Sequence, residues 1–287
     1  MRRRLCVVAA AALLVSCYPA PETPRETQSP AAPPAASSVT AHPSPTEDAT
    51  SPSAQPVDLQ PIIDDVVAVY GGTAGVAVSD GGAELVGGDD GAYPAWSTIK
   101  VPIAIAALRQ DPSLGPVAAA AIQYSDNDAA QRLWSALPPG AVDAVLAEGG
   151  NDVQVNTAVL RPEFSLFGQT AWSPSEQARF AAHLPCIADA DEVVASMGQV
   201  TAEQAYGIGR LPDARFKGGW GPDLQGKYTV RQFGLVAGPS GEVAVALTAA
   251  PASGTYADAQ AMATQIADGV AKQLPQAPLA VCGGATS

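Results

Sequence analysis

Histidine is scarce in this chain of 287 residues, which contains only His42 and His183. His42 lies in a Pro- and Ser-rich stretch near the N-terminus, so a Ser-His-Asp triad would have to use His183. His183 falls in the helical-looking segment 175–184, where a place on the helix surface is the simpler interpretation. C-x-x-C and H-E-x-x-H patterns are also missing. We therefore expect neither a metal nor a cofactor.

Positive charge is scarce as well. The chain has 15 Lys and Arg against 28 Asp and Glu, a formal net charge of −13. Nucleic-acid phosphates bind to basic surfaces, so we expect no nucleic-acid partner. No long apolar run follows the N-terminal segment, and we expect no membrane-spanning helix in the remainder of the chain.

The N-terminus has the pattern of a secretory signal. Arg2–Arg4 are followed by an apolar run, Leu5–Val15, that is too short to span a bilayer. Leu14-Val15-Ser16-Cys17 resembles a bacterial lipobox, which predicts a signal peptide over 1–17 and lipidation of Cys17. We therefore expect an extracytoplasmic protein held to the cell membrane by a lipid anchor. An ordinary signal peptide with a chance cysteine is the alternative.

Composition divides the rest of the chain in two. Residues 18–56 are rich in Pro, Ala, Ser and Thr without hydrophobic periodicity, which predicts a disordered tether. Residues 57–287 are long enough for one domain with its own core. Of the four cysteines, Cys6 leaves with the signal and Cys17 takes the lipid. We expect Cys186 and Cys282 to form a disulfide, with two buried free thiols as the alternative.

Three short motifs carry the candidate chemistry: Ser97-Thr98-Ile99-Lys100, Ser125-Asp126-Asn127 and Lys217-Gly218-Gly219. Residues three apart on a helix share a face, so a lysine there can lie beside the serine hydroxyl. If burial and other cations favour the neutral amine, that lysine can activate the serine without histidine. We therefore expect Ser97 Oγ and Lys100 Nζ within hydrogen-bond reach, with Ser125 and Lys217 facing the same cleft.

The ordered trio resembles the S-x-x-K, S-D-N and K-T-G elements of the class A β-lactamase and penicillin-binding serine acyl-enzyme superfamily. The resemblance implies Ser97 as nucleophile, Lys100 as its proton partner and Ser125 as the relay to the leaving group. It also implies an oxyanion hole formed by the backbone N–H groups of Ser97 and Trp220. The implied substrate-binding residues are Asn127, Lys217, Gly219 and Trp220.

Each motif also has a simpler interpretation. Ser97 could satisfy a backbone donor at a helix start, and Lys100 could be a solvated lysine. However, Lys100 is the only charge in the apolar run that ends at Leu108. Ser125-Asp126-Asn127 could be a helix cap or a turn. Lys217-Gly218-Gly219, where glycine replaces the family's hydroxyl residue, could be a plain strand-end turn.

Hydrophobic patterning predicts strands at both ends of the domain and helices between them. The expected strands are 75–79, 83–86, 216–220, 229–238 and 243–248, and the expected helices are 98–108, 118–133 and 255–274. This pattern indicates an α+β fold, an antiparallel sheet from both chain ends with an inserted helical lobe. The family resembled has this arrangement, with its active site between sheet and lobe.

Two further departures from the family bear on function. The chain reaches residue 118 within ten residues of the expected helix end, which predicts a more open cleft. Class A enzymes also carry a loop glutamate that activates the water releasing the acyl-enzyme. Aligning on Pro162-Glu163 puts Arg161 at that position, although Glu163 could substitute. We therefore expect slow deacylation.

Two functional hypotheses remain open. The first is a lipid-anchored, monomeric serine hydrolase that is acylated at Ser97 by β-lactams or by peptidoglycan-like peptide amides. The second is a catalytically silent lipoprotein that keeps the fold as a binding or scaffold protein of the cell envelope. The two lysines favour the enzyme, whereas Gly218, the shortened cleft wall and Arg161 favour the scaffold.

Overall fold

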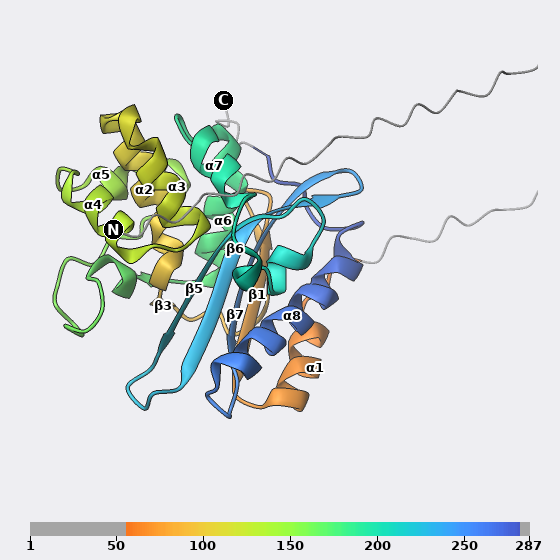
Figure 1. Cartoon of the computed structure of the whole chain (residues 1–287). Coiled ribbons are helices and arrows are strands. Elements are labelled where there is room, and N and C mark those ends of the chain that lie inside the picture. Colours follow the sequence, from red (N-terminus) through yellow and green to blue (C-terminus); the bar gives the residue numbers. More distant parts are fainter. Residues whose placement is uncertain (1–55, 282–287) are drawn as a thin grey trace, which may run out of the picture. The chain divides into compact units, whose positions relative to one another are not determined.

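A five-stranded antiparallel sheet forms the centre of the domain (Figure 1). The structure, a computed structural model, describes residues 56–281. The strands follow the order β2-β1-β7-β6-β5 across the sheet. Their bounds are β1 Thr73–Ser79, β2 Glu84–Gly88, β5 Arg215–Pro222, β6 Tyr228–Gly238 and β7 Gly241–Ala250. Strands from both ends of the domain thus meet at the pairing of β1 with β7, which the α+β prediction required.

The two faces of the sheet are buried against different layers. Successive side chains of a strand point to opposite faces. Accordingly, Val76 and Val78 join one hydrophobic cluster with α1 (Gln60–Tyr70) and α8 (Tyr256–Gln273), whereas Ala77 joins the other. That second cluster is the core of the helical lobe.

The helical lobe comprises the helices between β2 and β5. Its α-helices are α2 Lys100–Gln110, α3 Gly115–Gln123, α4 Asn127–Ser135, α5 Ala141–Glu148, α6 Pro174–His183 and α7 Asp191–Met197. Its 3-10 helices are η1 Trp96–Ile99, η2 Pro112–Leu114, η3 Phe167–Gln169 and η4 Leu184–Cys186. Two more, η5 Ala202–Gln204 and η6 Gly207–Arg210, precede β5, and β3 Tyr93–Pro94 pairs with β4 Ala171–Trp172. Helix α6 contacts β1 and β7 on the face opposite α1 and α8.

Helix α2 is the buried centre of the lobe. Every residue from Lys100 to Leu108 is buried, which is unusual for a helix in a domain of this size. Because α2 begins at Lys100 directly after η1, the first motif lies where the lobe meets the sheet. The fold therefore places this lysine at the start of an otherwise apolar helix.

The single helix expected over 118–133 is two helices, and this prediction was wrong. Ser125 has φ +57°, a left-handed conformation that interrupts an α-helix. Asp126 then caps α4, since its carboxylate accepts the Ala129 N–H at 2.8 Å. Ser125-Asp126-Asn127 is therefore a turn followed by a helix cap, as its simpler interpretation predicted. The break turns Ser125 and Asn127 toward α2 instead of leaving them on a continuous helix surface.

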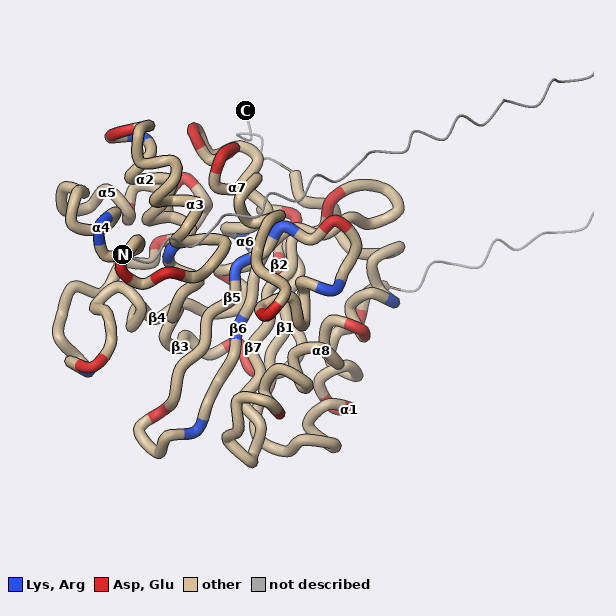
Figure 2. The backbone as a smooth tube through the Cα atoms, viewed as in Figure 1, with Lys and Arg blue, Asp and Glu red and all other residues tan. Residues whose placement is uncertain are grey.

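The acidic excess is spread over helices and loops rather than gathered on one face (Figure 2). Within residues 56–281, no helix is both long enough and apolar enough to cross a membrane. The signal peptide, the tether and Cys17 lie outside the described residues, so these expectations stay predictions.

The predicted disulfide also stays a prediction, because Cys282 lies outside the described part of the chain. Gly81 packs against both the His183 ring and the Val281 carbonyl. These two residues lie three positions before Cys186 and one before Cys282. His183 itself is half-buried at the end of α6, with its Nδ1 2.9 Å from the Arg179 carbonyl.

Candidate active site

The candidate nucleophile, Ser97, lies in η1 where the lobe approaches strand β5. A Cβ placed at Gly219 would be 2.9 Å from both the Ser97 nitrogen and the Ala95 oxygen. Only glycine lets β5 approach this closely. The same approach brings the next residue, Trp220, to the wall of the cavity that Ser97 lines. The two backbone N–H groups expected to form the oxyanion hole therefore belong to neighbouring segments.

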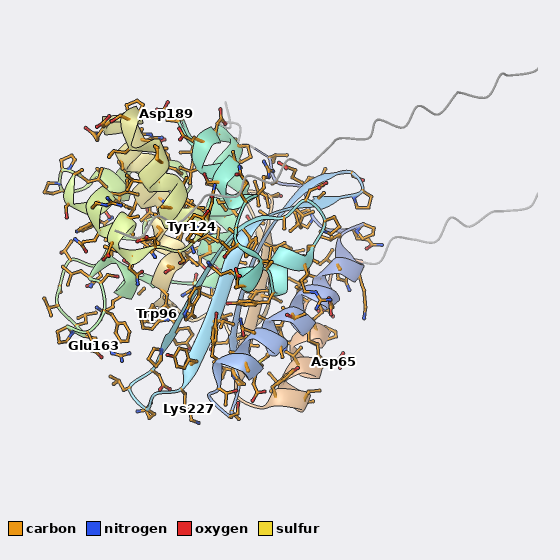
Figure 3. All side chains as sticks on the ribbon, viewed as in Figure 1. Asp65, Trp96, Tyr124, Glu163, Asp189 and Lys227 are labelled. Atoms are coloured by element: carbon orange, nitrogen blue, oxygen red, sulfur yellow. The ribbon has the colours of Figure 1, made fainter. Side chains whose placement is uncertain are left out.

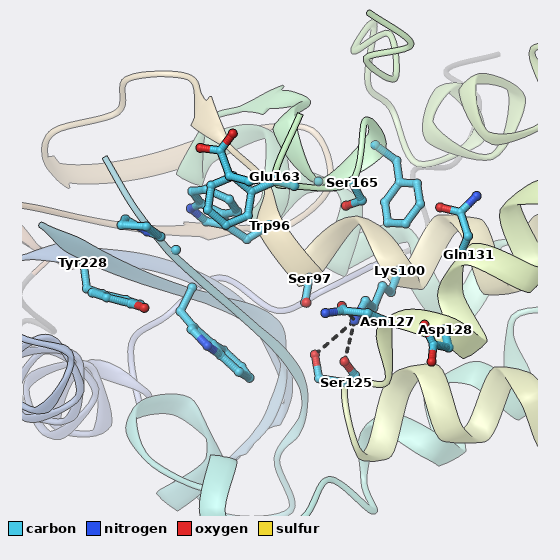
Figure 4. Close-up of a pocket in the computed structure, with 16 residues that line it drawn as sticks. Trp96, Ser97, Lys100, Ser125, Asn127, Asp128, Gln131, Glu163, Ser165 and Tyr228 are labelled. Carbon is cyan, nitrogen blue, oxygen red and sulfur yellow. Dashed lines mark hydrogen bonds between the residues drawn. The ribbon is translucent and has the colours of Figure 1, made fainter. Parts of the chain in front are cut away.

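Lys100 is buried beneath Ser97, with 1% of its surface exposed. Its Nζ donates to the Ser125 carbonyl at 2.5 Å and to Asn127 Oδ1 at 2.7 Å, and lies 3.5 Å from Ser125 Oγ (Figure 4). Burial lowers the pKa of Lys100 to about 8, against a smaller opposing effect of the Asp126 carboxylate. Near neutral pH, about a tenth of the Lys100 side chains are therefore unprotonated and able to accept a proton.

Lys217 lies on the other side of Ser125 and has no exposed surface. Its Nζ donates to Ser125 Oγ at 2.9 Å and to the Gly218 carbonyl at 2.7 Å. Burial, reinforced by repulsion from Lys100, holds the pKa of Lys217 well below its usual value. Both lysines thus point at one serine hydroxyl, whose own proton remains available for donation.

These residues surround a cavity of about 480 Å³ (Figure 4). Five of the seven candidate residues line it: Ser97, Lys100, Ser125, Asn127 and Trp220. Lys217 and Gly219 do not. Because Lys217 is wholly buried behind Ser125, it reaches the site through that hydroxyl, and its role as a substrate-binding residue stays a prediction.

The expected hydrogen bond between Ser97 Oγ and Lys100 Nζ is not present within residues 56–281. Among the hydrogen bonds of residues 56–281, those of Lys100 go to Ser125 and Asn127. The physical reason is the left-handed turn at Ser125, which brings a backbone carbonyl to the ammonium. Both groups still line the same cavity, so a proton transfer between them requires a change in the Lys100 side chain.

The loop around Glu163, which was expected to supply a deacylating carboxylate, does not direct its glutamate toward Ser97. Glu163 lines the cavity, but its side chain is 55% exposed and pairs with Arg161 at 3.0 Å. Its carboxylate points away from Ser97 (Figure 4). A hydrogen bond from its own backbone N–H, aided by Arg161, lowers the pKa of Glu163, so it is ionised. Ser165 is the loop side chain that faces the cavity near Ser97.

Arg161 does not line this cavity at all. Its Nη1 donates to the Pro222 carbonyl at 2.6 Å, and its guanidinium lies 4.4 Å from the centre of the Phe164 ring. It therefore fastens the loop to the end of β5. Figure 3 shows Glu163 and Trp96 on the same side of the molecule, beside the β5–β6 hairpin that carries Lys227. The alignment that put Arg161 at the glutamate position thus does not describe its place in space.

Several lining residues escaped sequence reasoning. Asp128 and Gln131 line the cavity from α4. Gln131 was detectable, because it lies four positions after Asn127 and shares its helix face. The aromatic lining residues Trp96, Phe164, Phe167 and Tyr228 had no such signal, since they converge from three segments far apart in the sequence. No group of three or more potential metal ligands occurs among the described residues.

Comparison with known proteins identifies the architecture. A family profile described as "Beta-lactamase enzyme family" matches residues 58–113, the segment that contains Ser97 and Lys100. The TLA-3 extended-spectrum β-lactamase aligns with a TM-score of 0.62 and 16% identity, over 76% of this chain and 98% of its own. A class A β-lactamase from Bacteroides cellulosilyticus aligns at 0.64 and 18%, over 76% and 97%. The chain has the class A β-lactamase fold.

A β-lactamase from Chitinophaga pinensis aligns with a TM-score of 0.60 and 18% identity, covering 73% of this chain and 96% of its own. No curated protein sequence matches the chain. The fold implied by the resemblance of the three motifs is confirmed. Ser97, Lys100 and Ser125 line the cavity where the lobe meets the sheet, and their catalytic roles stay predictions.

Proposed function

We propose that this protein is a serine hydrolase of the penicillin-recognising superfamily, acylated at Ser97 by β-lactams or by peptidoglycan-like peptide amides. One observation carries the proposal. Two buried lysines donate toward the Ser125 hydroxyl, and one of them, Lys100, lines the same cavity as Ser97 with its pKa lowered to about 8. Such an arrangement supplies a base and a proton relay without histidine.

Acylation follows from these groups. Neutral Lys100 accepts the proton of Ser97 while Ser97 Oγ forms a bond to the substrate carbonyl carbon. The developing oxyanion is met by the backbone N–H groups of Ser97 and Trp220. The amide C–N bond then breaks, the Ser125 hydroxyl gives its proton to the leaving nitrogen, and Lys100 returns a proton to Ser125. Atoms and charge balance without a metal or cofactor.

Release of the acyl group is the slow half of the reaction in this proposal. Hydrolysis of the ester at Ser97 requires a positioned water and a base. Glu163 is paired with Arg161 and turned away, and Arg161 stays protonated in proteins. We therefore expect the acyl-enzyme to persist for minutes or longer.

The decisive experiment is intact mass spectrometry of the domain mixed with a fluorescent penicillin. We expect a mass increase of one drug molecule that disappears in Ser97→Ala. Ser113→Ala, an exposed serine in η2 outside the cavity, is the matched control and should keep the adduct. Rapid multiple-turnover hydrolysis would show that some group does supply the missing base.

The silent scaffold is the second candidate, favoured by the missing Ser97–Lys100 hydrogen bond and by the turned-away carboxylate of Glu163. Absence of both an adduct and hydrolysis in a folded sample would establish it. The two candidates predict opposite results in this one experiment, because only an enzyme becomes covalently modified at Ser97.

We also propose that the mature protein is anchored by lipid at Cys17 and faces away from the cytoplasm. The charged, apolar and lipobox-like segments of the N-terminus support this proposal. Labelling expressing cells with palmitate should mark the mature protein that begins at Cys17, and Cys17→Ser should abolish the label. Cys6→Ser is the matched control, since Cys6 would be removed with the signal and should leave the label intact.

A further inference from the structure

A second cavity lies directly behind the first. It measures about 380 Å³, and its wall includes three residues that also line the 480 Å³ cavity around Ser97: Trp96, Gly221 and Pro222. Trp96 immediately precedes the candidate nucleophile. Its indole is the only side chain larger than proline shared by the two linings, so it separates one cavity from the other.

Trp96 is held in this position by its surroundings. A Cβ at Gly221 would lie 2.4 Å from the indole Cζ2, so the ring rests directly on the β5 backbone. Phe164 packs edge-on at 5.1 Å between ring centroids. The residue also has φ +51°, a conformation that a bulky side chain adopts only when its environment imposes it. The surrounding residues therefore fix the Trp96 indole in its position between the two cavities.

The charged groups around the second cavity already have partners. Arg231 is 1% exposed, and its guanidinium donates to three backbone carbonyls and to an amide side chain at 2.5–3.2 Å. Asp89 accepts from a tyrosine hydroxyl and a backbone N–H, both at 2.8 Å. Asp223 accepts from two backbone N–H groups at 2.8 Å. A ligand in this cavity would therefore meet mainly apolar walls such as Pro94 and Leu224, together with the threonines Thr73, Thr229 and Thr248.

We propose that Trp96 determines the size of the acyl group that Ser97 accepts, by closing the cleft against a second, apolar subsite. The inference rests on the proposed acylation at Ser97. Small acyl substituents fit the cleft as it stands. A bulky aromatic substituent requires the space behind the indole, which becomes continuous with the cleft when the ring is removed.

The test compares two β-lactams that differ in their acyl substituent: 6-aminopenicillanic acid, which has none, and nafcillin, which carries a naphthyl group. The measured quantity is the ratio of their acylation rates at Ser97, followed by intact mass. In Trp96→Gly the ratio should shift toward nafcillin by about tenfold or more, the scale on which apolar pockets discriminate size. Glycine accepts φ +51° without strain, so the neighbouring Ser97 N–H keeps its place. Trp96→Asn, which also tolerates this conformation, is the second variant if the first fails to fold.

Two controls separate opening of the subsite from simple widening of the cleft. Tyr228→Ala removes a ring that lines only the first cavity and packs against Tyr256 rather than against Trp96, so it should not produce the shift. Thr229→Phe, at a position lining only the second cavity, should abolish the gain when combined with Trp96→Gly. Three results would each overturn the subsite while leaving acylation at Ser97 standing. They are adducts with an unchanged ratio in both Trp96 variants, an equal shift in Tyr228→Ala, and a gain that survives Thr229→Phe. No adduct with either drug in any folded variant would overturn both proposals.

Discussion

Acylation by this protein should depend on pH through Lys100. Attack requires the unprotonated amine, and burial lowers the pKa of Lys100 to about 8. At this value the neutral fraction is about 1% at about pH 6, about 10% at about pH 7 and about half at about pH 8. The second-order acylation rate should therefore rise about tenfold per pH unit below the midpoint and level off above it. An ordinary solvated lysine, whose pKa is about 10.4, would still be rising at about pH 9.

The assay is a short incubation with fluorescent penicillin at a series of pH values, stopped with acid and read by intact mass. Asp126→Asn tests the assignment, because the Asp126 carboxylate favours the charged form of Lys100. Removing that charge while retaining a side chain that can still cap α4 should move the midpoint to lower pH. A flat profile between about pH 6 and pH 8, or a midpoint that ignores this substitution, would refute Lys100 as the base.

Three further outcomes follow from the same geometry. A buried lysine whose pKa is depressed in the folded state destabilises the fold at pH values below its unfolded pKa. Lys217→Met should therefore raise the Tm near neutral pH, at roughly 2–4 °C per kcal/mol of unfolding free energy gained. The exposed substitution Lys272→Met is the control and should leave the Tm unchanged. Gly219→Ala places a methyl group 2.9 Å from the nucleophile's amide nitrogen and should slow acylation by about 10²–10³-fold, measured as adduct formation on protein whose melting shows it to be folded. Ser165→Glu introduces a carboxylate into the cleft around Ser97 and should shorten the lifetime of the adduct. Arg161→Glu places a carboxylate at the second cavity instead and should not shorten it. Equal effects of the two variants on the time course of adduct loss would contradict the proposed loop geometry.

Much of the sheet and part of the lobe were predictable because they follow from short-range periodicity. The expected strand 229–238 is β6 within one residue, and the expected helix 255–274 is α8 with Thr255 as its cap. Both are long segments with a clear apolar pattern. Helix α1 was not anticipated, although Pro61 at its start is a recognised signal. The long helix over 118–133 failed because a local cap at Asp126 outweighed the apolar residues on either side.

The motifs predicted five of the residues that line the cavity, but not the contacts between their side chains. Lys217 and Ser125 are 92 positions apart, and no local pattern states that their side chains meet. The same holds for Trp96, whose role depends on the absence of a side chain at Gly221 on another element. Motif order predicts which residues share a cleft. The burial of Lys217 and the direction of Glu163 depend on packing around them, which sequence spacing does not encode.

The energetics of the two lysines favour the enzyme over the scaffold. Helix α2 would gain stability from an apolar residue at Lys100, because every position after it through Leu108 is buried. Lys217 is fully buried beside a second cation, which lowers its pKa further. A binding protein that needs only the shape of the cleft has no physical use for either amine, since both point at the Ser125 hydroxyl rather than outward at a partner. A proton relay beside Ser97 would need both amines, so their unfavourable placement supports the proposed acyl-enzyme.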